Sequence, residues 1–334
     1  MIPSEVGATP SHRLATAATA IANLNRRVRR NVAPSLPALF KNIASISIFP
    51  DKELMSDPDV PPGPDKQKKF PTEFDLRHGD CVRGMRDLPD ESVDLVVTSP
   101  PYNLGISYQS YNDKLSSEDY LAWSLEWAGE VKRLLKPEGS FFLNVGAAPA
   151  NPWMPHELAL ALRDLFDLQN TIHWIKSITV EPRDSDPVSV GHFKPINSKR
   201  FVNDCHEFVF HFTKTGKVPV DRIAVGVPYA DKSNIKRWGH TGGRDKRCRG
   251  NNWFIPYETI VSRNRDRPHP ATFPVELARK CILLHGGEPS ALTMMDPFLG
   301  IGHAATAAGE EGLGRFIGFE IDDGYWEEAK ERIE

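Results

Sequence analysis

The sequence predicts an α/β protein built on a largely parallel sheet, and two stretches carry this prediction. The β-branched run Val93–Val97, a helical pattern at 117–136 and the apolar run Ser140–Val145 follow one another at the spacing of a β-α-β unit, which joins parallel strands. Near the C-terminus, Leu292–Met295 leads into a glycine turn and the small-residue run Ala304–Ala308. A strand, a glycine turn and a close-packing helix in that order form a nucleotide-binding unit.

The composition is that of a globular protein. The 334 residues carry a net charge of −3, with 40% hydrophobic and 25% charged residues, which is ordinary for a soluble chain. No apolar run reaches the roughly 18 residues of a membrane span. The four cysteines are too scattered for a zinc site or a disulfide framework. We therefore expect a cytoplasmic protein with no membrane segment and no metal.

Residues 1–70 differ in composition from the rest. Ala, Ser, Pro and Asn dominate the first part, four arginines cluster between positions 26 and 30, and a proline-rich run follows at 57–65. We expect a flexible or disordered extension and linker here. A basic tail, or a start codon placed too early, is favoured over an organelle transit peptide.

Ordered structure is expected from Phe74 onwards. The apolar spacing within helix 117–136 predicts a buried stripe of Leu121, Leu125, Ala128, Val131 and Leu135. The remaining pattern predicts strands at 74–78, 171–180, 206–213 and 315–322, and helices at 81–88, 154–166, 274–284 and 325–333. Trp174 and Phe210 are expected in the core. The regular alternation breaks down between 214 and 268.

The strand at Val93–Val97 runs straight into Thr98-Ser-Pro-Pro-Tyr-Asn103. Each proline fixes φ and lacks an N–H, so the backbone is stiff and its carbonyls are left as acceptors. An aromatic ring follows at once. Rigid acceptors beside a flat ring suit a planar group that bears an NH2, although an ordinary proline turn after a strand would look the same.

The C-terminal glycine turn reads Asp296-Pro-Phe-Leu-Gly-Ile-Gly302. Glycines let the backbone approach a ligand closely. Glu320 ends the next predicted strand 24 residues after Asp296, and an acid about 20 residues on is placed to bind ribose hydroxyls.

Together these two motifs resemble the DNA amino-methyltransferases, which methylate exocyclic amines of DNA bases with S-adenosyl-L-methionine. Thr98–Asn103 is similar to the catalytic motif of that family. Asp296–Gly302 with Gly318-Phe-Glu320 is similar to its cofactor motif. The resemblance covers 74–334 and implies a Rossmann-like methyltransferase fold. Because the cofactor motif follows the catalytic one, it implies the circularly permuted order of the β-class subgroup, with an inserted DNA-recognition region.

The resemblance also implies roles for single residues. Ser99 and the Pro100 carbonyl would accept hydrogen bonds from the target amine, Pro101 would stiffen the turn, and Tyr102 would stack on a base flipped out of the duplex. The expected cofactor-binding residues are Asp80, Phe273, Asp296, Pro297, Phe298, Gly300, Gly302 and Glu320. One departure is His303, where Thr or Ser is commoner; a His donor could replace that hydroxyl.

The segment that breaks the alternation is basic. Residues 231–270 hold ten Lys or Arg and four Asp or Glu, interleaved with aromatics and glycines. Given the resemblance, a DNA-recognition segment is favoured over a solvated loop. The candidate DNA contacts are Lys236, Arg237, Arg244, Lys246, Arg247 and Arg249. The expected organisation is an extension at 1–70, a catalytic part at 71–213, the recognition region at 214–268 and a cofactor part at 269–334.

The resulting hypothesis is a site-specific methyltransferase that acts on the N4 amine of cytosine in double-stranded DNA. In the family, Ser in the first motif position goes with cytosine N4 and Asp with adenine N6, but the rule has exceptions, so N6 of adenine is the alternative. An RNA base, a protein glutamine or a DNA-binding module without catalysis is less favoured. A cognate restriction endonuclease and a homodimer remain open as partners.

Overall fold

The computed structural model describes residues 70–103, 113–149, 151–181, 186–191, 193, 197–237, 239, 242–256 and 272–334. They belong to one compact unit formed by 64–181 and 186–334. The extension expected at 1–70 lies outside the described residues, except for Phe70. Among the helices of the described part, none has the length and apolar character needed to cross a membrane.

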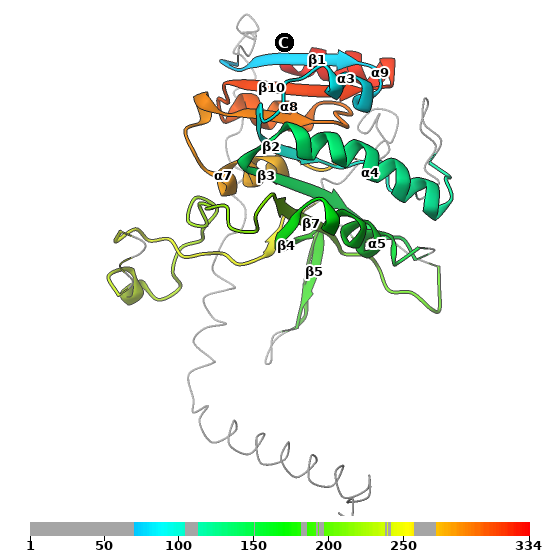
Figure 1. Cartoon of the computed structure of the whole chain (residues 1–334). Helices are drawn as coiled ribbons and strands as arrows, with labels where there is room; N and C mark the ends of the chain where they lie inside the picture. Colours follow the sequence, from blue (N-terminus) through cyan, green and yellow to red (C-terminus); the bar gives the residue numbers. More distant parts are fainter. Residues whose placement is uncertain are drawn as a thin grey trace, which may run out of the picture. The chain divides into compact units, whose positions relative to one another are not determined.

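A central sheet of eight strands organises the fold (Figure 1). Its spatial order is β1-β10-β9-β2-β3-β7-β4-β8, and β7 is the strand that runs antiparallel to its neighbours. The strands are β1 Glu73–His78, β2 Val93–Thr98, β3 Leu135–Val145, β4 Asp167–Ile175, β7 His206–Thr213, β8 Asn252–Phe254, β9 Thr293–Asp296 and β10 Arg315–Glu320. A separate hairpin pairs β5 Ser177–Val180 with β6 Val188–Gly191. The expected mixed α/β fold with a mostly parallel sheet is confirmed.

Helices cover both faces of this sheet. Apolar side chains of α3, α4 and α5 pack with one face, and those of α7 and α8 pack with the other. The helices are α3 Cys81–Arg86, α4 Ser117–Leu134, α5 Met154–Ala161, α7 Val275–His285, α8 His303–Glu310 and α9 Asp323–Ile333, with short 3-10 turns at Leu162–Asp164, Lys232–Ile235 and Pro289–Ala291. Because β2 is buried on both faces, it reads as a nearly continuous apolar run.

Helix α4 begins where the sequence predicts, with the Ser116 side chain accepting from the Asp119 backbone N–H at 3.1 Å. It ends two residues early because Leu135 already pairs with Val93 in the sheet. Three residues of the predicted stripe, Ala128, Val131 and Leu135, are fully buried. Leu125 is 39% exposed, so this part of the prediction is wrong. The buried face consists of Tyr120, Ser124, Trp127, Ala128, Val131 and Leu134. Trp127 packs edge-on against Phe141 of β3.

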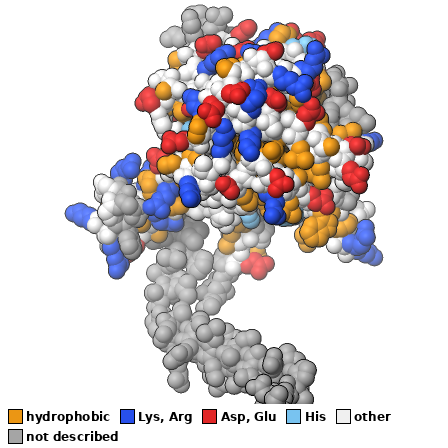
Figure 2. Space-filling model, in the orientation of Figure 1, with side chains coloured by type: hydrophobic (Ala, Val, Ile, Leu, Met, Phe, Trp, Pro, Cys, Tyr) orange, Lys and Arg blue, Asp and Glu red, His pale blue; other side chains and the backbone are white. Residues whose placement is uncertain are grey.

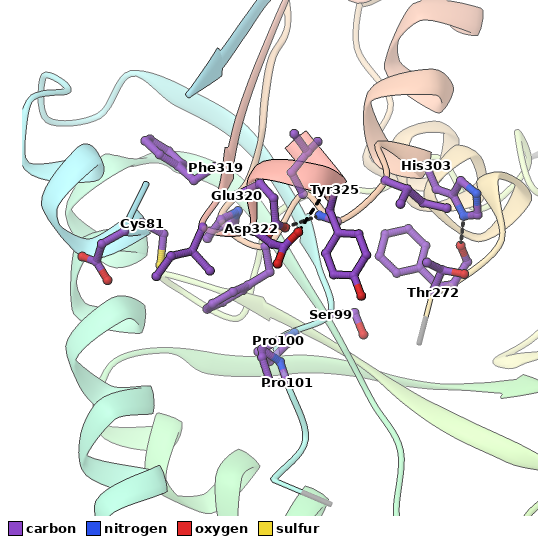
Figure 3. Close-up of a pocket in the computed structure, with 18 of the residues that line it drawn as sticks. Cys81, Ser99, Pro100, Pro101, Thr272, His303, Phe319, Glu320, Asp322 and Tyr325 are labelled. Atoms are coloured by element: carbon purple, nitrogen blue, oxygen red, sulfur yellow. Dashed lines mark hydrogen bonds between the residues drawn. The ribbon is translucent and has the colours of Figure 1, made fainter. Parts of the chain in front are cut away.

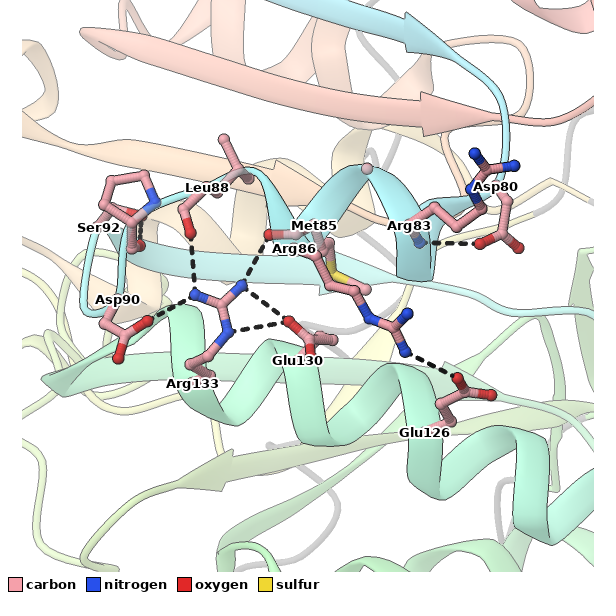
Figure 4. Close-up of polar contacts among 12 residues, drawn as sticks. Asp80, Arg83, Met85, Arg86, Leu88, Asp90, Ser92, Glu126, Glu130 and Arg133 are labelled. Carbon is pink, nitrogen blue, oxygen red and sulfur yellow. Dashed lines mark hydrogen bonds and ion pairs between the residues drawn. The ribbon is translucent and has the colours of Figure 1, made fainter.

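Arg133, at the end of α4, binds the C-terminal end of the short helix α3 (Figure 4). Its guanidinium donates to the carbonyls of Met85 and Leu88 at 2.8 and 2.9 Å and pairs with the Glu130 carboxylate. These carbonyls lie at and just beyond the C-terminus of α3, where a helix leaves acceptors without partners. The contact holds α3, and with it the N-cap residue Asp80, against the sheet.

Two further predictions change in detail. The strand expected at 171–180 is divided at Lys176 into β4 and β5. The region 214–268 contains the short strand β8, which extends the sheet beside β4 with Trp253 in register with Trp174. A strand of three residues shows no alternation in the sequence. Trp174 and Phe210 are buried, as predicted.

The topology places a crevice at one point of the sheet. From β9 the chain passes through α8 to β10, whereas from the adjacent β2 it passes through α4 to β3 on the other side. Connections that leave in opposite directions open a gap at the carboxyl ends of the two strands, which is where ligands bind in such sheets.

Candidate active site

A pocket occupies this crevice (Figure 3). It encloses about 1200 Å³ including its solvent-open mouth. The loop after β2 contributes Ser99, Pro100, Pro101 and Tyr102 to its lining. The loop after β9 and the end of β10 form the opposite wall. The two motifs from distant parts of the sequence therefore face one cavity.

The loop after β2 is held on several sides. The Tyr120 hydroxyl of α4 donates to the Pro101 carbonyl at 2.8 Å. Asn103 has a positive φ of 56° and exchanges two side-chain hydrogen bonds with the backbone of Leu115. Thr98 Oγ1 donates to Asp296 Oδ1 at 2.5 Å, which ties this loop to the glycine loop. The prolines and these bonds give the turn a single shape.

Asp296 and Gly302 support the glycine loop from behind the pocket lining. Asp296 is 1% exposed, and its Oδ1 also accepts from the Phe298 N–H at 3.0 Å. Burial raises the pKa of the Asp296 carboxyl to about 7. Gly302 precedes α8 with a φ of +85°, and a Cβ there would lie 3.1 Å from Ala329 Cβ. Six of the eight predicted cofactor residues line the pocket, and these two do not.

Three acids line the other wall, and backbone N–H groups position each of them. Glu320, at the end of β10, accepts from Gly300 and Asp322 at 2.8 and 2.9 Å. Asp80 caps α3, and Asp322 caps α9. Burial raises the pKa of Glu320. Carboxylates beside apolar surface offer acceptors for hydroxyl groups and partners for cations.

His303 begins α8 and also lines the pocket. Its Nδ1 lies 2.6 Å from the Phe273 carbonyl oxygen, so Nδ1 carries the proton and donates it. The neutral ring then presents Nε2 as an acceptor, not as a second donor. In the neutral form His303 therefore does not supply the donor expected in place of a Thr or Ser hydroxyl.

The six predicted DNA contacts lie away from the pocket lining, on the segment between β7 and β8. Figure 2 shows Lys and Arg side chains gathered on this segment, at the left of the view. Five of the six are exposed. Arg249 is half-buried and donates from Nε to the Val225 carbonyl at 2.6 Å, and burial lowers its pKa.

Comparison with known proteins places this arrangement in a family. The model of a DNA methylase family, covering N6 and N4 enzymes, matches residues 93–331. The chain belongs to this N6/N4 DNA methylase family. Type II methyltransferase M.BglII from Bacillus subtilis is 30% identical over 277 residues, which cover 78% of this chain and 71% of that protein.

Two solved structures resemble this DNA methylase. PvuII DNA methyltransferase, which is cytosine-N4-specific, matches with a TM-score of 0.56 and 21% identity over 80% of this chain and 89% of that one. The putative DNA modification methylase TTHA0409 from Thermus thermophilus, complexed with S-adenosyl-L-methionine, matches with a TM-score of 0.50 and 25% identity over 78% of this chain and 95% of that one. At 21% identity, the PvuII structure shows only that the two proteins share a fold.

The structure brings to this site three polar residues that sequence reasoning missed. Asn144 of β3, Glu207 of β7 and Lys176 after β4 form a cluster with Ser99 and Tyr102. Asn144 and Glu207 are nearly buried, at 2% and 9% exposure. The sequence signal that could have found Asn144 and Glu207 is a polar residue within a mostly apolar strand, because a buried polar group needs a hydrogen-bond partner.

Proposed function

We propose that this protein transfers a methyl group from S-adenosyl-L-methionine to the exocyclic N4 amine of cytosine in duplex DNA. The observation that supports cytosine is Ser99 in the first motif position, with its hydroxyl on the pocket lining. The N6 amine of adenine is the alternative, because the family covers N6 and N4 enzymes. The type II relative M.BglII supports a place in a restriction-modification system.

The residues that line the pocket fit the methyl donor. Glu320 would bind the ribose hydroxyls, Asp80 would lie near the adenosine, and Phe273 would line the methionine end. Pro297, Phe298 and Gly300 complete the lining on the loop after β9. The TTHA0409 complex with S-adenosyl-L-methionine supports this assignment. When bound, the donor supplies an electrophilic methyl group on a sulfonium centre.

The residues of the β2 loop would act on the target amine. This amine is a poor nucleophile because its lone pair is delocalised into the ring. Acceptors that pull on its protons favour a tetrahedral nitrogen, and the Ser99 hydroxyl and the Pro100 carbonyl would do this. Tyr102 would stack on the base after it is flipped from the duplex. The main contribution of the protein would be positioning.

The organisation of the chain belongs to the same proposal. The strand that carries the catalytic motif, β2, precedes β9 and β10 in the chain but lies beside β9 in the sheet. This order supports a circularly permuted methyltransferase domain in which 71–213 and 269–334 share one sheet. The basic segment within 214–268 would then be the inserted target-recognition region, with the six basic residues at the DNA phosphates and base edges.

The deciding experiment is mass spectrometry of nucleosides from unmethylated DNA incubated with the protein and isotope-labelled S-adenosyl-L-methionine. Labelled N4-methylcytosine is the expected product. Labelled N6-methyladenine would keep the fold and the mechanism but overturn the inference from Ser99. No labelled base from duplex DNA, in a protein that binds the cofactor, would contradict the proposed substrate.

A further inference from the structure

A chain of hydrogen bonds leads from Ser99 away from the pocket. Ser99 Oγ lies 2.6 Å from the Tyr102 hydroxyl, which donates to Glu207 Oε2 at 3.0 Å. The other Glu207 oxygen accepts from Lys176 Nζ at 2.8 Å. These residues are separated by up to 108 positions and come from the β2 loop, from β7 and from the residue that follows β4. The chain therefore connects the reactive face of the pocket with an ion pair.

Asn144 and Glu207 give this chain a direction. The Asn144 amide nitrogen lies 2.7 Å from both Glu207 Oε2 and the Tyr102 oxygen. An amide NH2 only donates, and a carboxylate only accepts. Tyr102 therefore accepts from Asn144 and points its own proton at Glu207.

The direction of the Tyr102 proton also fixes the direction of the hydrogen bond between Tyr102 and Ser99. Because the proton of Tyr102 points at Glu207, its oxygen accepts the Ser99 proton. Ser99 Oγ is then an acceptor: Asn144 Nδ2 lies 3.3 Å from it, and its remaining lone pair can accept from a target amine.

The following inference rests on the proposed function. We propose that Glu207 receives the proton that the amine must lose, through Tyr102 and Ser99. As the N–CH3 bond forms and the S–CH3 bond breaks, an amine proton moves to Ser99 Oγ, the Ser99 proton moves to the Tyr102 oxygen, and the Tyr102 proton moves to Glu207 Oε2. Ser99 and Tyr102 end neutral. The positive charge lost from the sulfonium and the negative charge of Glu207 cancel.

The surroundings of Glu207 suit this role. Its side chain is 11% exposed and that of Lys176 is 18% exposed, so solvent screens the charges of this ion pair poorly. Tyr102, Lys176 and His206 are the titratable groups that act on Glu207 from the β2 loop, from the end of β4 and from β7. His206 is the neighbour of Glu207 on β7, so its side chain points to the opposite face of the sheet.

The test compares single-turnover methyl incorporation into PCR-amplified DNA for the wild type, Glu207→Gln and Tyr102→Phe. Gln keeps the size and one acceptor but takes no proton at neutral pH, and Phe keeps the ring that stacks. We expect each variant to be about 100-fold slower, as for loss of a proton-transfer group, and the double variant to be no slower than either one. Glu126→Gln, at an exposed pair with Arg86, is the matched control and keeps the wild-type rate.

The pH profile separates proton transfer from a structural role. A pH dependence of the wild-type rate that comes from the relay should be missing in Glu207→Gln but kept in His206→Asn. A pH dependence that persists in Glu207→Gln, or a Tyr102→Phe rate equal to wild type, overturns the relay. Unchanged affinity for S-adenosyl-L-methionine, measured by calorimetry, shows that the variants are folded. An inactive wild type instead contradicts the proposed function.

Discussion

The two walls of the pocket are built in different ways. On the wall after β9 and β10, backbone N–H groups no more than 20 residues away hold the acids. On the wall after β2, side chains hold the Tyr102 hydroxyl, and these partners lie 42 and 105 residues away in the chain. Local backbone bonds thus position the acids that line the wall after β9 and β10, whereas Asp296 behind them is tied to Thr98 of β2. A wall held by distant side chains can be altered at one chemical group while the fold persists.

This contrast predicts that substitutions on the β2 wall change the rate of methyl transfer, whereas those on the other wall change cofactor affinity. The largest effect is expected for Ser99→Ala. In the proposed mechanism this hydroxyl is an acceptor at the target amine, and loss of one such preorganised group typically costs about 100-fold or more in rate, roughly 3 kcal/mol. Single-turnover methylation should show this loss, and calorimetry should show wild-type affinity for S-adenosyl-L-methionine. Weaker cofactor binding in Ser99→Ala would break the division between the walls.

The basic segment outside both walls should affect neither the cofactor nor the chemistry. We expect the triple change Arg244→Ala, Lys246→Ala and Arg247→Ala to weaken DNA binding about 30-fold at moderate salt. Each lost phosphate contact lowers the salt dependence of log affinity by about 0.9. Fluorescence anisotropy with labelled duplex DNA at several salt concentrations measures both quantities. An unchanged salt slope would show that this segment is a solvated loop.

A smaller effect is expected on the cofactor wall from Glu320→Gln. Gln keeps one carbonyl oxygen, so one of the N–H groups of Gly300 and Asp322 would face an NH2 donor. The mispaired donor should loosen the glycine loop and weaken affinity for S-adenosyl-L-methionine about 10-fold, roughly 1.4 kcal/mol. Calorimetry gives the affinity, and the rate at saturating cofactor should remain near wild type. A fall in that saturated rate would place Glu320 in the chemistry.

The same contrast explains what the sequence could predict. The Ser99–Tyr102 loop and the Asp296–Gly302 loop each have a local pattern that requires one backbone shape, so both could be found without the fold. Glu207 and Asn144 have meaning only once β3 and β7 pair, with Asn144 in register with Val209. Each is a polar residue within a strand, but the sequence does not show which strands pair and bring the two side chains together. The burial of Trp127 in place of Leu125 on α4 was missed for a related reason, because Trp127 packs against Phe141 of the distant strand β3.

The last prediction concerns two buried groups whose pKa values are shifted in opposite directions. His211 of β7 stacks on Phe142 and lies 3.1 Å from Ser140 Oγ. Burial, with a contribution from His285, lowers the pKa of His211 from 6.5 to about 3, whereas burial raises that of Asp296 from 3.8 to about 7. The folded state therefore holds fewer protons than the unfolded state at His211 between pH 3 and 6.5, and more at Asp296 between pH 3.8 and 7.

Each difference of one proton gives a slope of about 1.4 kcal/mol per pH unit in the free energy of unfolding. The His211 contribution rises with pH, the Asp296 contribution falls, and between about pH 4 and 6.5 the two cancel. In Asp296→Asn the contribution of His211 is no longer cancelled, so the free energy of unfolding of this variant should rise from pH 4 to 6.5. His211→Asn should do the reverse, with stability falling from pH 4 to 7. Urea unfolding at several pH values measures both slopes. Parallel profiles for the two variants would show that the glycine-loop wall is not closed around a buried, protonated Asp296.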